Sequence, residues 1–312
     1  MIKVLITTTS FQDTPGKHHE ILEQTGWNFI KMRGPLKEKE LLEVIDKVDA
    51  VICGDDEYTR NVIKKGREGR LKYISKYGVG LDSIDLKAAK EFCIPVANCP
   101  GVNQVSVAEH VLALLLTFEK NIHLQHQTTQ KGSWKRMIGN EISGLTIGII
   151  GIGSVGKELA KKAFAFGLKV IAFDVCKDEE FLNKNRYITF VTQLEDIFKK
   201  SDIISLHLPH TPQTEHLINR EVVFDKLKKT PIIINTSRGK LVEVDAIIDG
   251  LKSMKIRGYL TDVLEIEPIA LNEKLKNIDN IIITPHVGSR TYQSVERQGS
   301  MAVNNLIKMI NG

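Results

Sequence analysis

The sequence predicts an α/β protein built from two doubly wound, parallel-sheet domains. Short runs rich in β-branched residues alternate with segments of helical periodicity along nearly the whole chain, a pattern typical of parallel sheets. The runs fall into two blocks, separated by an apolar helix and a polar stretch. The length of 312 residues corresponds to two domains of about 100–200 residues each.

The first block alternates predicted strands with predicted helices. Runs of β-branched and aromatic residues predict strands at 2–8, 27–32, 49–53, 71–77 and 94–97. Segments with apolar residues at helical spacing lie between them, at 17–25, 38–47, 59–65 and 84–92. This order is that of a small flavodoxin-like unit.

The second block carries the longer predicted sheet. It begins with an apolar helix at 106–118 and a polar stretch at 121–141 that contains Trp134. Strands are then predicted at 146–150, 169–174, 202–208, 231–236, 259–263 and 281–284. Helices are predicted at 156–166 and 244–252, and a last amphipathic helix at 292–310 ends the chain.

Composition excludes several classes of protein. Hydrophobic residues make up 42% and charged residues 26% of the chain, close to the globular average, so wholesale disorder is excluded. The net charge is +5, but lysines alternate with glutamates along predicted helix faces, as in KEKE at 37–40, rather than gathering in a stripe for nucleic acid. The most apolar run, at 111–116, is too short to span a membrane, and no signal peptide is recognisable. We therefore expect a cytoplasmic protein. Its four cysteines lack metal-ligand spacing, and we expect them to be buried reduced thiols. They are Cys53, Cys93, Cys99 and Cys176.

A glycine-rich turn in the second block points to a dinucleotide. The sequence GIGSVG at 151–156 follows a predicted strand and opens a helix. Gly151 permits the tight turn, Gly153 lets the backbone approach a pyrophosphate, and Gly156 allows close packing of helix on strand. Free N–H groups at the helix start face the phosphates. Asp174 ends the next strand, where a carboxylate accepts hydrogen bonds from a ribose and repels a 2′-phosphate. The turn therefore predicts NAD rather than NADP.

Three more polar residues follow predicted strands of the same sheet. Arg238 and His286 stand just past predicted strands, Asp262 follows GYLT at 258–261 at the end of another, and Glu267 lies shortly after Asp262. Arginine grips a carboxylate through two parallel bonds, and histidine exchanges a proton near neutral pH. A carboxylate hydrogen-bonded to a histidine raises the pKa of the imidazole and fixes its orientation. Taken singly, Arg238 fits a surface ion pair, Glu267 a turn, and His286 an incidental histidine. Taken together, beside a dinucleotide turn, they indicate a catalytic set.

These residues resemble the NAD-dependent D-isomer-specific 2-hydroxyacid dehydrogenases over essentially the whole chain. The matching motifs are GVGLDSID at 78–85, VAEH at 107–110, NTSRG at 235–239, Asp262 to Pro268, and TPHVG at 284–288. The resemblance implies that Arg238 anchors the substrate, that His286 is the general acid and base, and that Glu267 is its partner.

The resemblance also implies the two binding sites. The implied NAD site comprises Gly151, Gly153, Ser154, Val155, Gly156, Asp174, His207, Pro209, Thr214, Thr236, Ser237, Asp262 and Gly288. The implied substrate site comprises Val79, Gly80 and Asn103, with backbone N–H groups around Val79 and Gly80 on the carboxylate. No metal site is expected, because the pairs His18/His19 and His123/His126 have no apparent third ligand and fit exposed polar histidines better.

The resemblance further implies that the first domain is discontinuous. A Rossmann NAD-binding domain, at 104–286, is inserted into a flavodoxin-like substrate domain formed by 1–103 and 287–312. Hydride then passes between nicotinamide and C2 of a 2-oxo acid while His286 protonates the carbonyl oxygen, and domain closure excludes water. A homodimer through the 121–141 arm and the 106–118 helix is implied as well.

Within the family, the motifs resemble most the phosphoglycerate dehydrogenase-like branch. Two features depart from it: the chain ends at Gly312 without the regulatory domain common there, and the sequence CGDDEY at 53–58 places acids where an arginine often faces phosphate. These acids repel a phosphate if they point into the pocket, whereas a solvated loop is the alternative. Basic residues that could compensate are Arg60, Lys76, Lys135, Arg136 and Arg290.

We therefore predict a D-3-phosphoglycerate dehydrogenase-like enzyme acting on a small hydroxy acid. Glyoxylate or hydroxypyruvate reductase is the alternative, since it needs the carboxylate anchors without a phosphate site. An NADH-sensing co-repressor of the C-terminal-binding-protein type is the alternative from a different class, because such proteins share the fold and the NAD site.

Overall fold

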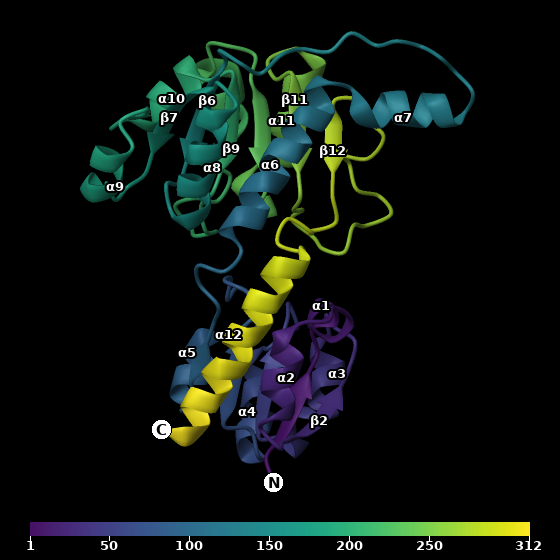
Figure 1. The fold of residues 1–312 in the computed structure, drawn as a ribbon, viewed down its shortest axis with the longest axis vertical. Coiled ribbons are helices and arrows are strands. Elements are labelled where there is room, and N and C mark those ends of the chain that lie inside the picture. The colour runs from purple at the N-terminus through teal and green to yellow at the C-terminus, as the bar shows by residue number, and fades with distance from the viewer. The chain divides into compact units, whose positions relative to one another are not determined.

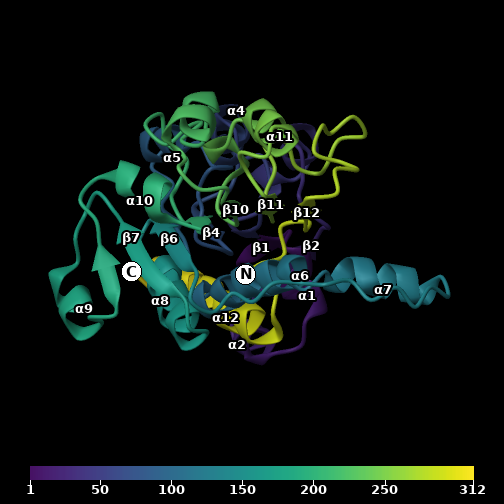
Figure 2. The same cartoon turned by 90° about the horizontal axis from the view of Figure 1, so that it is seen from above.

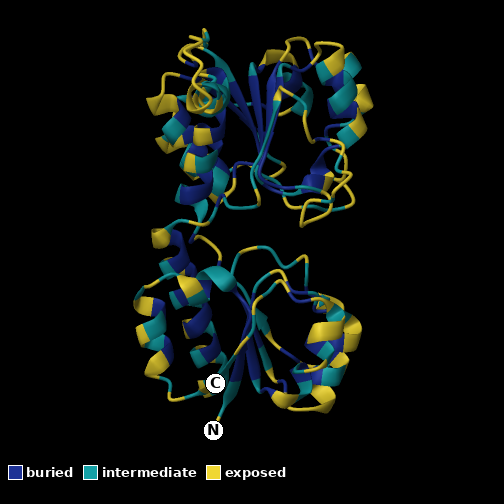
Figure 3. Cartoon of the chain, turned by 90° about the vertical axis from the view of Figure 1, so that its right-hand side faces the viewer, coloured by how far each residue is buried: buried dark blue, intermediate teal, exposed yellow.

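The computed structural model describes residues 1–312, and the chain divides into two compact units. Unit 1 is Met1–Asn103 with Ser289–Gly312, and unit 2 is Gln104–Gly288 (Figure 1). The sequence prediction places these boundaries after residues 103 and 286. Each unit is a parallel sheet whose strands are largely buried between layers of helices (Figure 3).

Unit 1 contains a five-stranded parallel sheet in the order β2-β1-β3-β4-β5. Its strands are β1 (Lys3–Ile6), β2 (Asn28–Lys31), β3 (Ala50–Cys53), β4 (Tyr73–Lys76) and β5 (Val96–Ala97). Its helices are α1 (Thr9–Asp13), α2 (Lys17–Glu23), α3 (Glu38–Leu42), a 3-10 turn (Ile45–Lys47), α4 (Arg60–Glu68), α5 (Leu86–Glu91) and α12 (Tyr292–Asn311). The strands bury β-branched residues on both faces, as expected where helices cover both sides of a parallel sheet.

The last helix, α12, completes unit 1. Ala302, Val303 and Leu306 are fully buried in one core cluster with residues of β1 and β3. The side chain of Ser75 on β4 also donates a hydrogen bond to the carbonyl of Ala302 at 2.8 Å. The C-terminal segment therefore belongs to the core of the N-terminal sheet.

Unit 2 contains a seven-stranded parallel sheet in the order β12-β11-β10-β9-β6-β7-β8. Its strands are β6 (Thr146–Ile150), β7 (Lys169–Phe173), β8 (Ile188–Phe190), β9 (Ile203–Leu206), β10 (Ile232–Asn235), β11 (Gly258–Thr261) and β12 (Ile281–Ile283). Its helices are α6 (Gln104–Glu119), α7 (Ile122–Gln130), α8 (Ser154–Ala165), α9 (Glu179–Lys184), α10 (Leu194–Lys200), a π-helical turn (Val222–Lys226), a 3-10 turn (Gly239–Leu241) and α11 (Val244–Lys252). The strand order reverses between β6 and β9, and such switch points are where doubly wound sheets bind ligands.

Part of the polar stretch at 121–141 is helical. The helix α7 buries none of its residues, and Figures 1 and 2 both show it running out from the rest of unit 2, with an extended segment after it. Trp134 and Ile138, in that segment, are 78% and 95% exposed. The sequence pattern misses this helix because no apolar stripe marks a buried face.

Two expectations about single residues are wrong. Cys53 and Cys99 are buried, but Cys93 and Cys176 are exposed, although all four are free thiols. His18, expected to be exposed, is completely buried: its ring packs on Gly299 of α12, and its Nε2 lies 3.0 Å from the carbonyl oxygen of Phe11. No helix has the length and apolar character needed to cross a membrane.

Candidate active site and cofactor site

The glycine-rich turn joins β6 to α8 at the switch point. Gly151 has a φ of +96°, and a Cβ there would lie 2.4 Å from the carbonyl oxygen of His207. A Cβ on Gly156 would lie 2.1 Å from the carbonyl oxygen of Gly151, so both positions require glycine. A Cβ on Gly153 would meet nothing within 4 Å, and Gly153 and Ser154 are exposed. The backbone at the start of α8, including Val155, is thus open to a ligand, as phosphate binding there requires.

Asp174 lies directly after β7 and is bound to this turn. Its Oδ2 accepts a hydrogen bond from the N–H of Ile152 at 2.8 Å, and its Oδ1 accepts one from the N–H of Cys176 at 3.0 Å. The next residue, Val175, is 95% exposed and carries no charge for a 2′-phosphate. The carboxylate is therefore held beside the turn where a ribose diol would lie.

The loops after β9 and β10 form the other side of the switch point. His207 follows β9, and its Nε2 lies 2.8 Å from the hydroxyl of Ser205; burial lowers the pKa of His207 to about 4. Thr214 donates to the carbonyl of Pro209 at 2.7 Å, which fixes the turn between them. After β10, the hydroxyl of Thr236 is buried without a hydrogen-bond partner, although buried hydroxyls are normally paired. An unpaired hydroxyl at this edge fits a bound dinucleotide.

His286 and Glu267 face each other on the loops that follow β12 and β11. Nδ1 of His286 lies 2.7 Å from Oε2 of Glu267, and both side chains are partly exposed. The other oxygen of Glu267, Oε1, accepts a hydrogen bond from the N–H of Leu264 at 2.9 Å. The backbone of His286 has a φ of +52°, a left-handed conformation that strains a non-glycine residue. Strain of this kind persists only where the surroundings enforce it.

Asp262 enforces the conformation of the His286 loop. Its Oδ1 accepts hydrogen bonds from the hydroxyl of Thr284 at 2.6 Å and from the N–H of Val287 at 2.9 Å. Its Oδ2 accepts one from the N–H of Gly288 at 2.7 Å, and the carbonyl of Asp262 accepts one from the N–H of His286 at 2.9 Å. Each hydrogen bond fixes part of the 284–288 segment relative to β11.

His110 on α6 extends this network from the other side. Its Nε2 lies 2.9 Å from the hydroxyl of Thr284 and 3.4 Å from Oδ1 of Asp262. Desolvation by burial raises the pKa of Asp262, but the hydrogen bonds from His110, Thr284, Val287 and Gly288 outweigh it, so the pKa is lowered overall. Asp262 therefore stays ionised inside the unit.

Arg238 lies on the loop after β10. Its Nη1 donates to the carbonyl of Ser237 at 2.6 Å, and the side-chain amide of Asn235 donates to the carbonyl of Arg238 at 2.8 Å. The hydroxyl of Ser237 in turn donates to the carbonyl of Leu206 on the neighbouring strand. The loop that carries the guanidinium is thus fixed to the carboxyl end of the sheet, the end where His286 and Asp174 also lie.

Comparisons with known proteins agree with this geometry. Residues 112–288 match the family model described as "D-isomer specific 2-hydroxyacid dehydrogenase, NAD binding domain". The chain is 38% identical to a hydroxypyruvate reductase of Thermotoga maritima over 278 residues, 88% of each chain.

The chain belongs to the D-isomer-specific 2-hydroxyacid dehydrogenases.

Two further comparisons cover the full chain. It is 36% identical over 315 residues to a D-3-phosphoglycerate dehydrogenase of Methanocaldococcus jannaschii, a match that covers 100% of this chain and 58% of that protein. The solved structure of the TT0316 protein from Thermus thermophilus superposes with a TM-score of 0.88 at 34% identity, covering 100% of this chain and 97% of that one. The protein is accordingly an NAD-dependent oxidoreductase, and NAD is its cofactor.

The residues expected to bind the substrate of this dehydrogenase lie in unit 1. Val79, Gly80 and Asn103 belong to loops after β4 and β5, and the carbonyl of Val79 accepts a hydrogen bond from the side chain of Asn98 at 2.7 Å. Val79 is 41% exposed, so its backbone lies near the surface of the unit. Their role stays a prediction.

The acidic run at 55–57 of the dehydrogenase performs three different tasks. Asp55 pairs with the buried Lys76 at 2.7 Å, and Glu57 pairs with Lys37 at 2.8 Å. Asp56 is completely buried; it accepts hydrogen bonds from Thr7 and from two backbone N–H groups. Burial raises the pKa of Asp56, against the opposing effect of those hydrogen bonds. The alternative of a solvated loop is therefore wrong for Asp56.

Several residues that contact the loops carrying Glu267 and His286 have no role in the sequence prediction. His110 stands in the quoted VAEH motif, but nothing local shows that it reaches Thr284, 174 positions away. Glu265 stands two positions before Glu267, yet its partner His216 is 49 positions away. Both contacts arise only when distant loops converge at the sheet edge.

Proposed function

We propose that this dehydrogenase interconverts a D-2-hydroxy acid and its 2-oxo acid, with His286, Glu267 and Arg238 as the catalytic residues. The observation that supports this best is the 2.7 Å contact between His286 and Glu267, on a loop that Asp262 holds in a strained conformation. Strained backbone is typical of functional sites.

NAD, when bound at the glycine-rich turn, supplies or accepts the hydride. During reduction, Nε2 of the protonated His286 donates a proton to the carbonyl oxygen of the substrate. Glu267 holds the ring through Nδ1 and stabilises the imidazolium. Arg238 stabilises the negative charge that develops on the same oxygen. During oxidation, His286 is the base that takes up the hydroxyl proton. Backbone N–H groups around Val79 and Gly80, with Asn103, are proposed to hold the substrate carboxylate.

The cofactor residues named from the sequence are proposed to divide into three groups. Gly151, Gly153, Ser154, Val155 and Gly156 face the pyrophosphate, and Asp174 faces the adenosine ribose. The remainder border the nicotinamide half and include the buried, unpaired hydroxyl of Thr236. These are His207, Pro209, Thr214, Thr236, Ser237, Asp262 and Gly288.

On substrate identity, the structure favours a small unphosphorylated acid such as hydroxypyruvate or glyoxylate. Two of the cations expected to bind phosphate already have acidic partners: Lys76 pairs with Asp55 at 2.7 Å, and Arg60 pairs with Glu91. A phosphorylated tail would compete with those carboxylates. The predicted phosphoglycerate-type substrate is the second candidate, supported by the 36% identity to the Methanocaldococcus jannaschii enzyme along the full chain.

We further propose that the enzyme works in the cytoplasm as a homodimer. All four cysteines are free thiols, which fits a reducing compartment. The segment after α7 exposes Trp134 and Ile138, large apolar side chains that a second copy would cover. Size-exclusion chromatography with light scattering tests the dimer.

An NADH-oxidation assay tests the proposed reaction and the substrate. The panel contains hydroxypyruvate, glyoxylate, 3-phosphohydroxypyruvate and longer 2-oxo acids, and we expect the highest kcat/KM with one of the first two. Preference for 3-phosphohydroxypyruvate would establish the second candidate instead. His286→Ala is expected to lower kcat by about 10²–10⁴-fold with NADH binding retained. Wild-type turnover in that variant would contradict the mechanism, and NADH binding without turnover of any 2-oxo acid by the wild type would favour the co-repressor-type alternative.

A further inference from the structure

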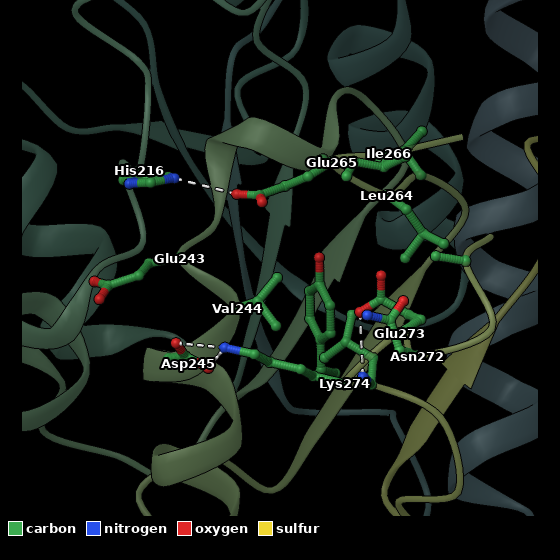
Figure 4. Close-up of a pocket in the computed structure, with 15 residues that line it drawn as sticks. His216, Glu243, Val244, Asp245, Leu264, Glu265, Ile266, Asn272, Glu273 and Lys274 are labelled. Carbon is green, nitrogen blue, oxygen red and sulfur yellow. Dashed lines mark hydrogen bonds and ion pairs between the residues drawn. The ribbon is translucent and has the colours of Figure 1, made fainter. Parts of the chain in front are cut away.

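The imidazole of His216 contacts the loop that carries Glu267. Nε2 of His216 lies 3.2 Å from Oε1 of Glu265, which stands two positions before Glu267. Figure 4 shows this contact across one side of a cavity lined by residues of the 264–275 loop and of α11. Both side chains are partly exposed, so either can be replaced without leaving a cavity in the hydrophobic core.

The main chain of His216 is fixed to the loop that carries Arg238. Its N–H donates to the carbonyl of Lys240 at 2.8 Å, and two residues later the N–H of Ile218 donates to the carbonyl of Leu241 at 3.0 Å. Lys240 is two positions after Arg238. His216 also has a φ of +49°, so its backbone adopts a conformation that few side chains favour. One residue therefore contacts both loops, through its backbone on one side and its side chain on the other.

The same two loops touch directly at Gly239. A Cβ on Gly239 would lie 2.0 Å from the carbonyl carbon of Leu264 and 2.3 Å from the nitrogen of Glu265. No side chain fits between the two backbones. The N–H of Leu264, in the same peptide segment, donates to Oε1 of Glu267, whose Oε2 contacts His286. A shift of Leu264 and Glu265 away from Gly239 would thus move the Glu267 carboxylate relative to His286.

We propose that His216 is a positioning residue that clamps the Glu267 loop onto the Arg238 loop, keeping Glu267 in contact with His286. This rests on the proposed function, since it assumes that Arg238, Glu267 and His286 carry the chemistry. The clamp acts at a distance from the reacting atoms: His216 holds Glu265, the adjacent Leu264 holds Glu267, and Glu267 orients the imidazole. A loosened carboxylate orients the general acid less well, and orientation is a large part of what such a pair contributes.

A second pair on the same loop provides a matched control. Lys274 contacts Asp245 of α11 at 2.7 Å, and Figure 4 shows it lining the same cavity as His216. It ties the far end of the 264–275 loop, and the side chains of both partners are more than half exposed. Exposed ion pairs of this kind contribute little to stability. Asp245→Asn therefore perturbs the loop without touching the contact between Leu264, Glu265 and Gly239.

The test compares His216→Asn, Glu265→Ala and Glu265→Gln with Asp245→Asn. Asparagine tolerates positive φ but is too short to reach Glu265, and glutamine keeps the acceptor oxygen. We expect kcat to fall about tenfold in His216→Asn and in Glu265→Ala, with KM for NADH unchanged. Glu265→Gln is expected to retain most of kcat, and Asp245→Asn all of it. The double variant His216→Asn/Glu265→Ala is expected to be no slower than either single variant, because both remove one contact.

A readout independent of turnover is the titration of His286 in ¹⁵N-histidine-labelled protein, assigned with His286→Ala. Separation from Glu267 stabilises the imidazolium less, so the midpoint is expected to move to lower pH in His216→Asn and to stay in place in Asp245→Asn. A wild-type midpoint in His216→Asn overturns the proposal, whether or not thermal stability falls, and so does an additive double variant. If His286→Ala keeps its activity, the proposed function fails, while the titration still decides whether His216 positions Glu267 against His286.

Discussion

Replacing Asp262 by asparagine is expected to release the loop that carries His286. The carboxylate accepts hydrogen bonds on both oxygens, from Thr284 and Val287 on Oδ1 and from Gly288 on Oδ2. Asparagine has the same shape but only one acceptor oxygen, so in either orientation its NH₂ group faces a backbone N–H. A lost hydrogen bond to a charged group costs about 1.5–3 kcal/mol, and the buried donor left without a partner adds to this. We therefore expect Asp262→Asn to destabilise unit 2 by on the order of 3 kcal/mol.

The same substitution is expected to lower kcat by about 10–100-fold. The left-handed backbone of His286 costs about 1–3 kcal/mol. It persists because the hydrogen bonds to Asp262 hold the 284–288 segment in place. When the loop relaxes, the fraction of molecules with the imidazole in place falls by about tenfold for each 1.4 kcal/mol of strain released. The assays are steady-state turnover and urea unfolding. Asp202→Asn is the control, because Asp202 also accepts a backbone hydrogen bond, from Thr146 at 2.8 Å, at the opposite end of the sheet.

The pH dependence of stability gives a second test of the same carboxylate. The pKa of Asp262 is lower in the folded protein than in the unfolded chain, so its contribution is present above about pH 4 and is lost as the pH falls through the folded pKa. The stability difference between the wild type and Asp262→Asn should therefore shrink below about pH 4. Wild-type kcat and wild-type stability in Asp262→Asn at neutral pH would show that Asp262 does not hold the His286 loop.

Three further outcomes are expected. Asp174→Ala should weaken NADH binding more than NADPH binding in a fluorescence titration, because the carboxylate selects the free ribose diol; equal losses contradict that assignment. Burial lowers the pKa of His18 in the folded protein, so below about pH 6.5 the unfolded chain binds a proton more readily than the folded one. Between about pH 7.5 and about pH 5.5 the Tm of the wild type should therefore drop more than the Tm of His18→Gln. Parallel Tm curves for the two proteins contradict this. Asp55→Asn removes the partner of Lys76 and should lower KM for 3-phosphohydroxypyruvate several-fold while leaving KM for hydroxypyruvate, with Glu57→Gln on the same loop as control. Unchanged KM values would show that Lys76 does not meet the substrate.

The strands and the cofactor turn could be predicted because their information is local. Runs such as 232–234 and 147–150 are buried on both faces and contain no polar side chain. The turn at 151–156 is recognised from its own glycines, which directly follow β6 and open α8. The short elements α9, β8 and α10 could not be predicted, because they span only three to seven residues each, too few to show a periodicity.

The roles of single polar residues could not be predicted, because they depend on distant contacts. Asp56 looks like one of three equivalent loop acids, yet Thr7 and the backbone of Leu36, at separations of 49 and 20 residues, bury it and use its oxygens. The resemblance implies that Asp262 touches NAD, but only the structure shows both its oxygens bonded to the 284–288 segment. Neither role is encoded in the neighbouring sequence.

The contact between His286 and Glu267 is held by two different sets of hydrogen bonds, both formed by the segment that follows β11. Asp262 fixes the His286 loop through Thr284, Val287 and Gly288, and no atom of that set takes part in holding Glu267. Glu267 is fixed through Leu264, on a segment packed against Gly239. Both anchors, Asp262 and Leu264, follow β11, so both members of the pair are held at the carboxyl edge of one sheet. Partly exposed side chains on loops can therefore still be preorganised, because their precision comes from the backbone hydrogen bonds beneath them. Asp262→Asn removes at least one of these bonds.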